Sequence, residues 1–456
     1  MKIDALVAEI GSTTTLINGF AGLDSSDPVF VGQGVHPTTV LEGDVTIGLE
    51  GAMKDLANRL GVASIEAKDT FACSSAAGGL RMTVHGLVHD MTVKAAKEAA
   101  LGAGANLKLV TAGLLDEDQI QAIKAIKPNI IMIAGGVDYG ETQTSLANAK
   151  QLAAIKLNIP IIYAGNIQNQ TKIRHLFEEQ GQASQLIIID NVYPKIDTLQ
   201  VEKARQVIQA VFEEHITKAR GMEKVRSLIK EAILPTPGAV MEAAILLQKE
   251  IGDILAFDVG GATTDVHSVT AGNPKITEKL IAPEPFAKRT VEGDLGVFIN
   301  RTHIVDSIGR DRLSKELEIS VLMLENWIKE LKPIPDPIHH SLVKRLTLEA
   351  LIVGCKRHAG HLIFQYGANG KITLAEGKDL TAIKTIIGTG GALTRLPDSQ
   401  GLIRIGLEKI DESFLKPGNA TKIQIDTDYL MATAGVLSKK YPLAAIALLK
   451  KSLKAR

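Results

Sequence analysis

Two segments, ALVAEIGSTTT at residues 5–15 and ILAFDVGGATT at residues 254–264, decide the fold of this 456-residue chain. Each contains an apolar run, a carboxylate, a β-branched residue, a glycine, a small residue and paired threonines, in the same order. This order predicts a buried strand that leads into a tight turn. One copy is weak evidence, because strands that end in glycine and threonine are common. Two copies far apart in one chain indicate two related halves.

Both turns have the groups that hold phosphate. Glycine lets the backbone approach closely, successive amides point at phosphate oxygens, and threonine hydroxyls add donors. A carboxylate placed before such a turn can hold hydrated magnesium, which bridges phosphate groups. We therefore expect two facing turns to clamp a polyphosphate, although two ordinary buried strands remain the alternative. The candidate phosphate-binding residues are Gly11, Ser12, Thr13, Thr14, Gly260, Gly261, Ala262 and Thr263, and the candidate metal-binding and catalytic residues are Glu9 and Asp258.

A third segment, IIGTGGAL at residues 386–393, again places an apolar run before closely spaced glycines. Gly388, Gly390 and Gly391 would let a nucleoside lie against bare backbone at the start of a helix. The spacing does not match the dinucleotide-binding fingerprint, and the Lys-Ser/Thr ending of a Walker loop is missing. The segment is therefore a candidate nucleotide-binding element of neither standard type.

Composition excludes several classes of protein. Hydrophobic residues make up 45% of the chain and charged residues 22%, which is typical of a folded globular protein. Lysine plus arginine total 51, as do aspartate plus glutamate, so no excess of basic charge can neutralise phosphate backbones or anionic lipid. We expect neither nucleic acid nor a membrane as a partner.

The cysteine content and the amino terminus predict a reduced, cytoplasmic setting. Cys73 and Cys355 alone cannot form a disulfide framework or the four-cysteine set of an iron–sulfur site. Asp4 and Glu9 enclose a short apolar run that is too brief and too acidic for a signal peptide. No apolar stretch approaches the roughly 20 residues of a membrane-spanning helix.

The middle of the chain alternates short β-branched runs with segments of helical spacing, the pattern of an α/β protein. The runs at 129–136, 159–165 and 186–190 predict parallel strands that are buried on both faces. Apolar residues at threes and fours predict a helix over 201–216. Residues 312–331 and 429–449 each read as one further helix.

The three glycine-containing segments together resemble the ATPase superfamily of actin, hexokinase, the heat-shock chaperone ATPases and acetate kinase. In that resemblance residues 11–14 match the first phosphate motif, 258–264 the second and 388–391 the adenosine motif. It implies an α/β fold in which two RNase H-like lobes close on Mg-ATP, with an inserted βα-rich domain. The implied units are a first ATPase lobe at 1–90 with the helices of 426–456 packed back on it, an inserted domain at 91–235 and a second ATPase lobe at 236–425.

Within that superfamily the chain resembles the MutL/GlmL group, the accessory proteins of adenosylcobalamin-dependent amino-acid mutases, which are unrelated to the mismatch-repair protein of similar name. The resemblance covers nearly the whole chain. It implies an ATP-dependent reactivating factor, or chaperone, that promotes exchange of damaged cobalamin, with ATP and Mg²⁺ as cofactors, mutase subunits as partners and a possible homo-oligomer. The motifs that carry it are IAGGVDYG at 133–140, YAGN at 163–166, LPTPGA at 234–239, RTVEGDLG at 289–296, RHAG at 357–360 and IGTGG at 387–391.

Two positions depart from the superfamily pattern. Glu9 stands where aspartate is usual, and Leu16 stands where a lysine often follows the first turn. Glutamate reaches one methylene further and can still hold magnesium through water. We therefore expect nucleotide binding to be retained and hydrolysis to be weak.

Three other functions remain open at this point. A small-molecule kinase of the same superfamily would use the middle block to bind a carboxylate or a sugar. The activator of 2-hydroxyacyl-CoA dehydratases carries an iron–sulfur cluster between two subunits, and two isolated cysteines argue against it. A nucleotide-gated scaffold without turnover would also fit Glu9 and Leu16.

Four further residues invite functional readings. Cys73 lies among serines and glycines, where a packed small residue is favoured over a nucleophile. His358 and His361 have the spacing of a metal pair, but Gly360 between them favours a helix end. Asp138 follows a predicted strand, where it either lines a second site or caps the next helix.

Overall fold

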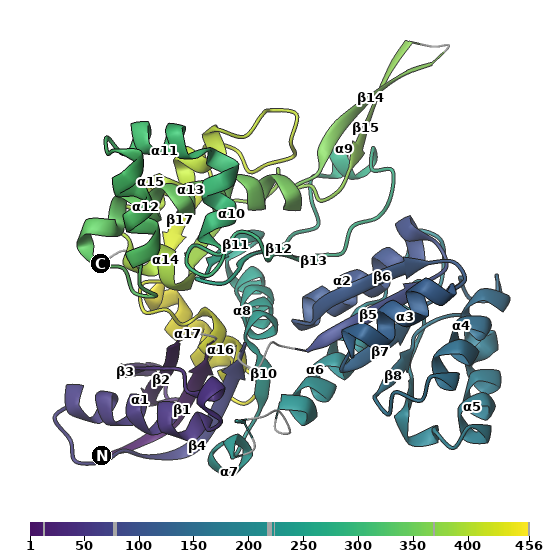
Figure 1. Ribbon diagram of the computed structural model, residues 1–456, viewed down its shortest axis with the longest axis horizontal. Helices are drawn as coiled ribbons and strands as arrows, with labels where there is room; N and C mark the ends of the chain where they lie inside the picture. Colours follow the sequence, from purple (N-terminus) through teal and green to yellow (C-terminus); the bar gives the residue numbers. More distant parts are fainter. Residues whose placement is uncertain (12–13, 76–79, 217–220, 223, 368–369, 455–456) are drawn as a thin grey trace.

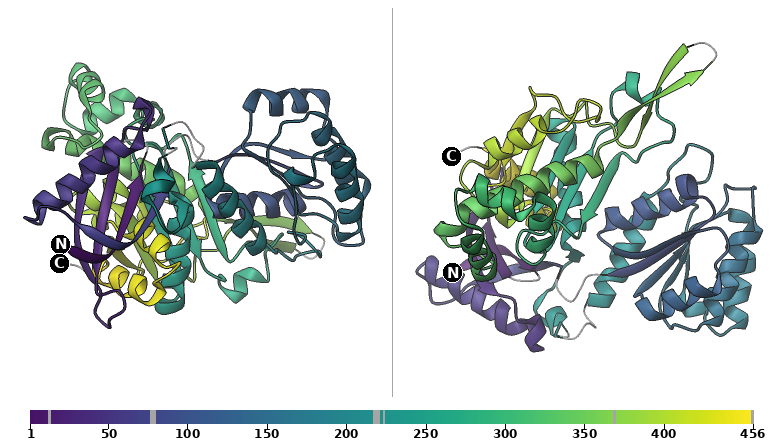
Figure 2. Two further views of the ribbon diagram at one scale, coloured as in Figure 1. Left: turned by 90° about the horizontal axis from the view of Figure 1, so that it is seen from below. Right: turned by 45° about the horizontal axis from the view of Figure 1, so that its top comes forward.

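The computed structural model describes residues 1–11, 14–75, 80–216, 221–222, 224–367 and 370–454. Strands in these residues form three five-stranded sheets and one two-stranded hairpin (Figure 1). The hairpin consists of β14 (His361–Gly367) and β15 (Gly370–Glu376), and it projects from the body of the molecule in Figure 1 and in the right-hand view of Figure 2.

Two of the sheets have the same topology. The first has the order β10-β4-β1-β2-β3, in which β3, β2 and β1 are antiparallel and β1, β4 and β10 are parallel. The second sheet, β13-β12-β11-β16-β17, repeats this arrangement in the reverse direction. Its antiparallel strands β11, β12 and β13 correspond to β1, β2 and β3, and its parallel strands β16 and β17 correspond to β4 and β10. This repetition confirms the predicted fold of two RNase H-like lobes. The strands are β1 (Lys2–Ile10), β2 (Thr14–Ala21), β3 (Val29–Pro37), β4 (Glu66–Ser74) and β10 (Ile233–Pro235), then β11 (Ile254–Val259), β12 (Thr264–Val269), β13 (Ala287–Glu292), β16 (Thr385–Thr389) and β17 (Lys422–Ile425).

The third sheet is entirely parallel, with the order β6-β5-β7-β8-β9. Its central strands β5, β7 and β8 are buried on both faces because helices cover each side, as the apolar runs predict for β7 and β8, whereas the edge strands β6 and β9 are partly exposed. Side chains such as Val84 and Met132 pack toward α2 and α6, whereas Ile131 and Ile133 pack toward α3, α4 and α5. The elements are β5 (Arg81–Gly86), β6 (Asn106–Ala112), β7 (Ile130–Ile133), β8 (Ile161–Tyr163) and β9 (Leu186–Ile188), with α2 (Lys94–Ala103), α3 (Glu117–Ile126), α4 (Gln143–Ala154), α5 (Gln170–Glu179) and α6 (Glu202–Ile216).

Strand pairing shows how this third sheet is connected to the first. β5 belongs to the third sheet, although it lies before residue 91, where the inserted domain is predicted to begin. β10 pairs with β4 of the first lobe, although it lies within the predicted inserted domain, which ends at 235. The division of the chain at 90, 235 and 425 stays a prediction.

The remaining helices are α1 (Val45–Arg59), α7 (Val225–Leu228), α8 (Thr236–Ile251), α9 (Pro274–Thr277), α10 (Arg301–Ile308), α11 (Arg310–Glu316), α12 (Val321–Glu330), α13 (His340–His358), α14 (Gly390–Arg395), α15 (Ser399–Glu408), α16 (Met431–Leu437) and α17 (Pro442–Ser452).

Two long helices expected from periodicity are each broken in two. Between α11 and α12 the backbone of Glu318 turns into the left-handed region, with φ of 56°, and the side chain of Ser320 caps the new helix. Between α16 and α17 the break ends at Pro442, which begins the second helix where its missing amide is harmless. The apolar spacing continues across both breaks, so periodicity alone could not locate them.

The lobes are joined by two helices that cross each other. α8 connects β10 of the first lobe to β11 of the second, and α16 follows β17 of the second lobe and packs on β1 and β4 of the first. They approach so closely that a β-carbon on Gly435 of α16 would lie 1.8 Å from the carbonyl oxygen of Ala239 in α8. Only glycine at position 435 permits this crossing.

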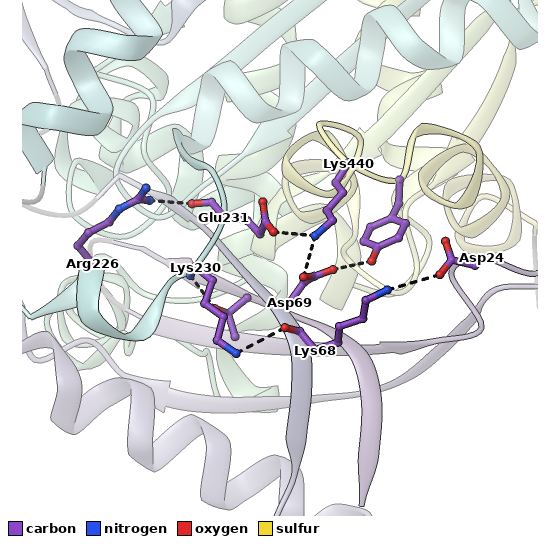
Figure 3. Close-up of polar contacts among 9 residues, drawn as sticks. Asp24, Lys68, Asp69, Arg226, Lys230, Glu231 and Lys440 are labelled. Atoms are coloured by element: carbon purple, nitrogen blue, oxygen red, sulfur yellow. Dashed lines mark hydrogen bonds and ion pairs between the residues drawn. The ribbon is translucent and has the colours of Figure 1, made fainter.

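Charged side chains around Asp69 of β4 hold the carboxyl-terminal helices on the first lobe (Figure 3). The ammonium of Lys440 donates to Asp69 Oδ1 at 2.8 Å and to Glu231 Oε1 at 2.7 Å, and the hydroxyl of Tyr441 donates to Asp69 Oδ2 at 2.5 Å. Asn18 of β2 adds a buried hydrogen bond of 2.8 Å to Thr433 of α16. The last helices are therefore part of the first lobe's packing.

We predict that Gly435→Ala destabilises the protein, because the new methyl group forces the backbones of α8 and α16 apart. The expected loss in the free energy of unfolding is about 2–3 kcal/mol, despite the gain of about 1 kcal/mol that alanine usually brings inside a helix. Thermal and denaturant unfolding followed by circular dichroism measure this change.

Gly406→Ala is the matched control, since Gly406 also lies inside a helix. A β-carbon on Gly406 would meet its nearest neighbour, Leu351, at an ordinary 3.5 Å. This variant should be as stable as the natural protein or more stable. Equal stability of the two variants would show that the helix crossing does not require glycine.

Candidate functional site

The two predicted phosphate turns have the same backbone geometry. The amide of Gly11 donates to the carbonyl of Thr14 at 2.9 Å, and the amide of Gly260 donates to the carbonyl of Thr263 at 2.9 Å. A β-carbon on the two glycines would lie 2.7 Å and 3.0 Å from those carbonyl oxygens, which explains why glycine occupies both positions. The predicted residues Ser12 and Thr13 lie outside the described residues.

The third glycine segment lies against the second turn. Thr389 at the end of β16 is in register with Asp258, and the next residue, Gly390, has φ of 85°. A β-carbon on Gly390 would be 2.5 Å from Asp258 Oδ1, so only glycine fits at position 390. Gly391 faces open space, whereas the β-carbon position of Gly388 faces apolar side chains such as Ile425. Packing alone therefore accounts for the glycine at 388.

The two lobes each contribute a carboxyl with a raised pKa, and the charge of Asp258 acts on Glu9. Glu9 ends β1 and is 5% exposed, and Asp258 lies on β11 at the corresponding place. Burial, followed by the negative charge of Asp258, raises the pKa of Glu9 to about 8. Burial, followed by the charge of Asp265, raises the pKa of Asp258 to about 7. The hydroxyl of Tyr429 donates to Glu9 Oε1 at 3.1 Å, while Glu9 Oε2 has no hydrogen-bond partner among the described residues.

Asp426 is a third buried carboxylate, which the sequence analysis missed. It follows β17, and burial raises its pKa as well. It accepts hydrogen bonds from Thr389 Oγ1 at 3.0 Å, from Ser452 Oγ at 2.5 Å and from the first amides of α16, so it connects the third glycine segment to the crossing helix. The signal was available, because KIQID at 422–426 is an apolar run that ends in a carboxylate. No glycine turn follows it.

A chain of contacts leads from the second turn to α2, which covers the third sheet, called the inserted sheet below. The hydroxyl of Thr263 donates to Asp265 Oδ2 at 3.0 Å, and Arg289 of β13 donates to Asp265 Oδ1 through two nitrogens, at 2.8 and 2.6 Å. A further nitrogen of Arg289 donates to the carbonyl of Leu101 in α2 at 2.9 Å. Because Arg289 is 3% exposed, these are buried, charge-assisted contacts.

The motif at residues 289–296 also supports this turn. The amides of Phe298 and Ile299 donate to the carbonyl of Gly261 at 2.9 and 2.7 Å. A β-carbon on Gly296 would lie 2.2 Å from the carbonyl of Ala262, so this segment crosses the turn in backbone contact. Residues of the second lobe therefore support the backbone of this turn.

A cavity of about 710 Å³ opens beside Thr263, between the lobes and the amino-terminal edge of the inserted sheet. Its lining is mixed, and its charged side chains include Lys97, Lys288, Arg289 and the buried Glu98. Glu98 Oε2 has no hydrogen-bond partner among the described residues, and burial raises the pKa of this carboxyl.

The other candidates have structural roles. Cys73 is fully buried in β4, and burial raises the pKa of its thiol, so it is packed and unreactive. His358 ends α13 and hydrogen-bonds to Thr290 and Ser268, whereas His361 begins β14. Within the described residues no group of three or more His, Cys, Asp or Glu side chains is arranged to hold a metal ion. A magnesium ion that keeps several waters does not require such a group.

Comparison with known proteins places this architecture in a family. A family model described as MutL protein matches residues 5–453. The chain belongs to the MutL protein family. Protein MutL of Clostridium tetanomorphum is 34% identical over an alignment of 463 positions, which covers 98% of this chain and 98% of that protein.

Solved structures resemble this MutL-family chain only distantly. A nucleotide-free acetone carboxylase is 11% identical, with a TM-score of 0.35 over 96% of this chain and 70% of that one. A nucleotide-free diol dehydratase-reactivating factor is 10% identical, with a TM-score of 0.33 over 96% and 99%. With such low scores, the fold assignment rests on the strand order of the two lobes. None of the helices in the described residues has the length and apolar character that crossing a membrane requires.

The raised pKa of Glu9 predicts how stability depends on pH when neither metal nor nucleotide is bound. Between the ordinary pKa of 4.5 and the folded pKa of about 8, the folded state binds a proton that the unfolded state has lost. The free energy of unfolding therefore falls as pH rises through this range, by up to about 5 kcal/mol from Glu9. Glu9→Gln should remove this share of the slope in denaturant titrations between about pH 5 and about pH 8.

Asp44→Asn provides the control for this titration. Hydrogen bonds from Lys224 and Thr46 lower the pKa of Asp44 to about 2, so its charge is constant above about pH 5. Its replacement should shift the whole curve without changing its slope. A Glu9→Gln slope equal to that of the natural protein would contradict the assignment of the proton to Glu9.

Proposed function

We propose that this protein is an ATP-dependent reactivating factor, or chaperone, for an adenosylcobalamin-dependent amino-acid mutase. The observation that carries the proposal is the pair of matching turns on two lobes, with the interacting carboxylates Glu9 and Asp258 and with crossing helices between the lobes. Membership of the MutL family supports the choice of client. Such mutases form radicals by breaking the cobalt–carbon bond, and a failed recombination leaves damaged cobalamin bound.

In this proposal the turns bind the phosphates of Mg-ATP. The amides of Gly11 and Gly260 close the turns by donating to the carbonyls of Thr14 and Thr263. The phosphate donors would therefore be the backbone amides of the residues that follow each glycine, which are Ser12, Thr13, Thr14, Gly261, Ala262 and Thr263. Adenosine lies against Gly390 and Gly391, where the backbone is bare and open space adjoins it. Gly388 contributes to the same segment through packing.

Glu9 and Asp258 fit a hydrated magnesium ion. A buried carboxyl, Glu9, and a partly buried one, Asp258, both with raised pKa values, gain from a divalent cation that restores their charge. Glu9 Oε2, which has no partner among the described residues, can face such an ion. The bound ion would bridge phosphate oxygens and offset their negative charge. Asp258 would also orient the attacking water. Because Glu9 replaces the usual aspartate, we propose slow turnover, in keeping with a switch.

Closure of the lobes would link nucleotide to client. α8 and α16 cross at Gly435, so motion of one lobe relative to the other is confined to these helices and the contacts around them. Moving such an equilibrium from 1:99 to 99:1 requires about 5.5 kcal/mol of differential binding, which a triphosphate held by both lobes can supply. The ATP-bound and nucleotide-free forms would then differ in affinity for the mutase.

Asp258→Asn should weaken Mg-ATP binding and reduce hydrolysis by about 100-fold, because it removes the proposed metal contact of the second lobe. Isothermal calorimetry with and without Mg²⁺ and a phosphate-release assay measure these effects. Asp306→Asn, an exposed change in α10, should leave both unchanged. Natural binding and hydrolysis in Asp258→Asn would show that the metal assignment is wrong.

Affinity capture from extract of the native cells, with and without Mg-ATP, tests the client. We expect mutase subunits to be recovered in a nucleotide-dependent manner and identified by mass spectrometry. Purified mutase that carries inactive cobalamin should then regain activity only when this protein, Mg-ATP and fresh adenosylcobalamin are added. Recovery of mutase without any cofactor exchange would contradict a reactivating role.

A small-molecule kinase of the same superfamily is the alternative that one observation favours. The cavity of about 710 Å³ beside Thr263 is large enough for a small carboxylate or sugar. A kinase also needs a base beside the acceptor, yet Asp265 is paired to Arg289. ADP release that depends on a small acceptor, without any mutase present, would support this alternative.

A further inference from the structure

Exposed apolar side chains in the inserted α/β unit, residues 81–201, are confined to one edge of its sheet. The large hydrophobic residues that are exposed there are Val88, Leu114, Tyr139, Ile167 and Ile196, with exposed fractions between 42% and 77%. One follows each of the five parallel strands, β5 to β9 in order. Because parallel strands end at the same edge, all five side chains belong to the carboxyl-terminal edge.

This edge is opposite the one that faces the ATPase lobes. The amino-terminal edge begins at Gly104 and Asn106, which line the cavity together with Pro235 and Pro237 of the lobe connection. A β-carbon on Gly104 would lie 2.9 Å from the backbone nitrogen of Gly238 in α8, so the backbones are in contact there. The inserted unit is therefore attached near one edge of its sheet and presents the other outward, as it lies beside the lobes in Figures 1 and 2.

Hydrogen bonds hold the apolar side chains in a fixed arrangement. Asp138 Oδ1 accepts from the amide of Ile167 at 3.0 Å and from the side chain of Asn191 at 2.9 Å, and the amide of Asp138 donates to the carbonyl of Pro194 at 2.9 Å. Asn166 Oδ1 accepts from the amide of Tyr139 at 3.2 Å. Hydrogen bonds thus join the loops after β7, β8 and β9, and Asp138 makes three of these bonds.

The same segments are strongly acidic. The connections at 87–93, 113–118, 134–142, 164–169 and 189–201 contain eight aspartate or glutamate residues and one lysine, Lys195. A rigid apolar surface with a surplus of negative charge favours a partner with apolar side chains surrounded by lysine and arginine. It disfavours anionic lipid and nucleic acid, which the same charge repels. The acidic residues are Asp90, Asp116, Glu117, Asp118, Asp138, Glu141, Asp190 and Asp197.

We infer that the carboxyl-terminal edge of the inserted sheet is the docking surface for the client mutase, which binds through an apolar patch with a basic rim. The identity of the occupant rests on the proposed function. The existence of the surface rests on the five exposed side chains and the acidic charge. The surface is separate from the proposed nucleotide site. It gives a role to the family motif around Asp138, which lies far from the nucleotide site.

Photocrosslinking of the full-length protein in native cell extract tests this inference. Tyr139 and Leu114 are replaced singly by p-benzoylphenylalanine, and Leu322 and Leu443, which are 74% and 81% exposed outside the inserted unit, are the matched controls. We expect crosslinks to a mutase subunit from positions 139 and 114, at least tenfold above the controls. The crosslinked mutase peptide should contain exposed apolar residues next to lysine or arginine.

A charge-reversal pair tests the electrostatic part with the crosslinked mutase as the probe. Asp90→Lys with Asp190→Lys should weaken binding about tenfold at low salt, and the difference should shrink as salt is raised. Glu50→Lys with Glu179→Lys changes the net charge equally at exposed positions away from this edge and should bind like the natural protein. Circular dichroism and Mg-ATP binding confirm that each variant is folded.

The outcomes separate this inference from the proposed function. No crosslink above the controls, or crosslinks to lipid, to another copy of this chain or to a protein other than a mutase, would overturn the docking inference. If cobalamin exchange still occurs in that case, the proposed function stands. If crosslinks to a mutase form and charge reversal weakens them, but no exchange occurs, the surface stands and the reactivating role is wrong.

Discussion

The contact between Gly435 and the carbonyl of Ala239 is the constraint on which the two-lobed arrangement depends. It lets α8 and α16 cross in backbone contact, so that each lobe is continued by a helix that lies against the other. A side chain at 435 would separate the helices and with them the two turns. The hydrogen bonds of Asp426 then fix the start of α16 to the end of β17 and to Thr389. The crossing and the candidate site are therefore one structural unit.

That unit brings three carboxyls together where the lobes meet. Glu9 and Asp426 are buried and Asp258 is partly buried, and burial is the first cause of the raised pKa of each. A fold keeps such groups only when something compensates them. Asp426 has four hydrogen-bond donors, whereas Glu9 has one from Tyr429 and, among the described residues, no partner for Oε2. Glu9 is thus the less compensated carboxyl, and it precedes the first turn, where a cation and a polyphosphate would be bound.

Local sequence patterns predicted the features that depend on local chemistry. Glycine at 11 and 260 is required by a carbonyl of its own turn, and the repeated order of residues revealed both turns. Long-range pairing was less visible. The strand at 81–86 joins the third sheet, yet nothing in its own residues tells which sheet it joins, and Asp426 acts without a following glycine. The ligand contact of Gly388 stays a prediction, because spacing cannot separate a bare backbone needed for a ligand from one needed for Ile425.

The helix α2 gives the proposed docking edge a mechanical link to the lobes. It begins just after the exposed Val88 at the carboxyl-terminal edge and ends near Leu101, whose carbonyl accepts a hydrogen bond from Arg289. Its ten residues span about 15 Å as one rigid element. Arg289 also holds Asp265, which receives the hydroxyl of Thr263 in the second turn. A change at that turn would therefore reach the outer edge of the inserted sheet through buried, charge-assisted contacts and one helix. Such a path requires no unfolding of either unit, and it is compatible with a nucleotide site between the lobes and a client site on the outer edge of the inserted sheet.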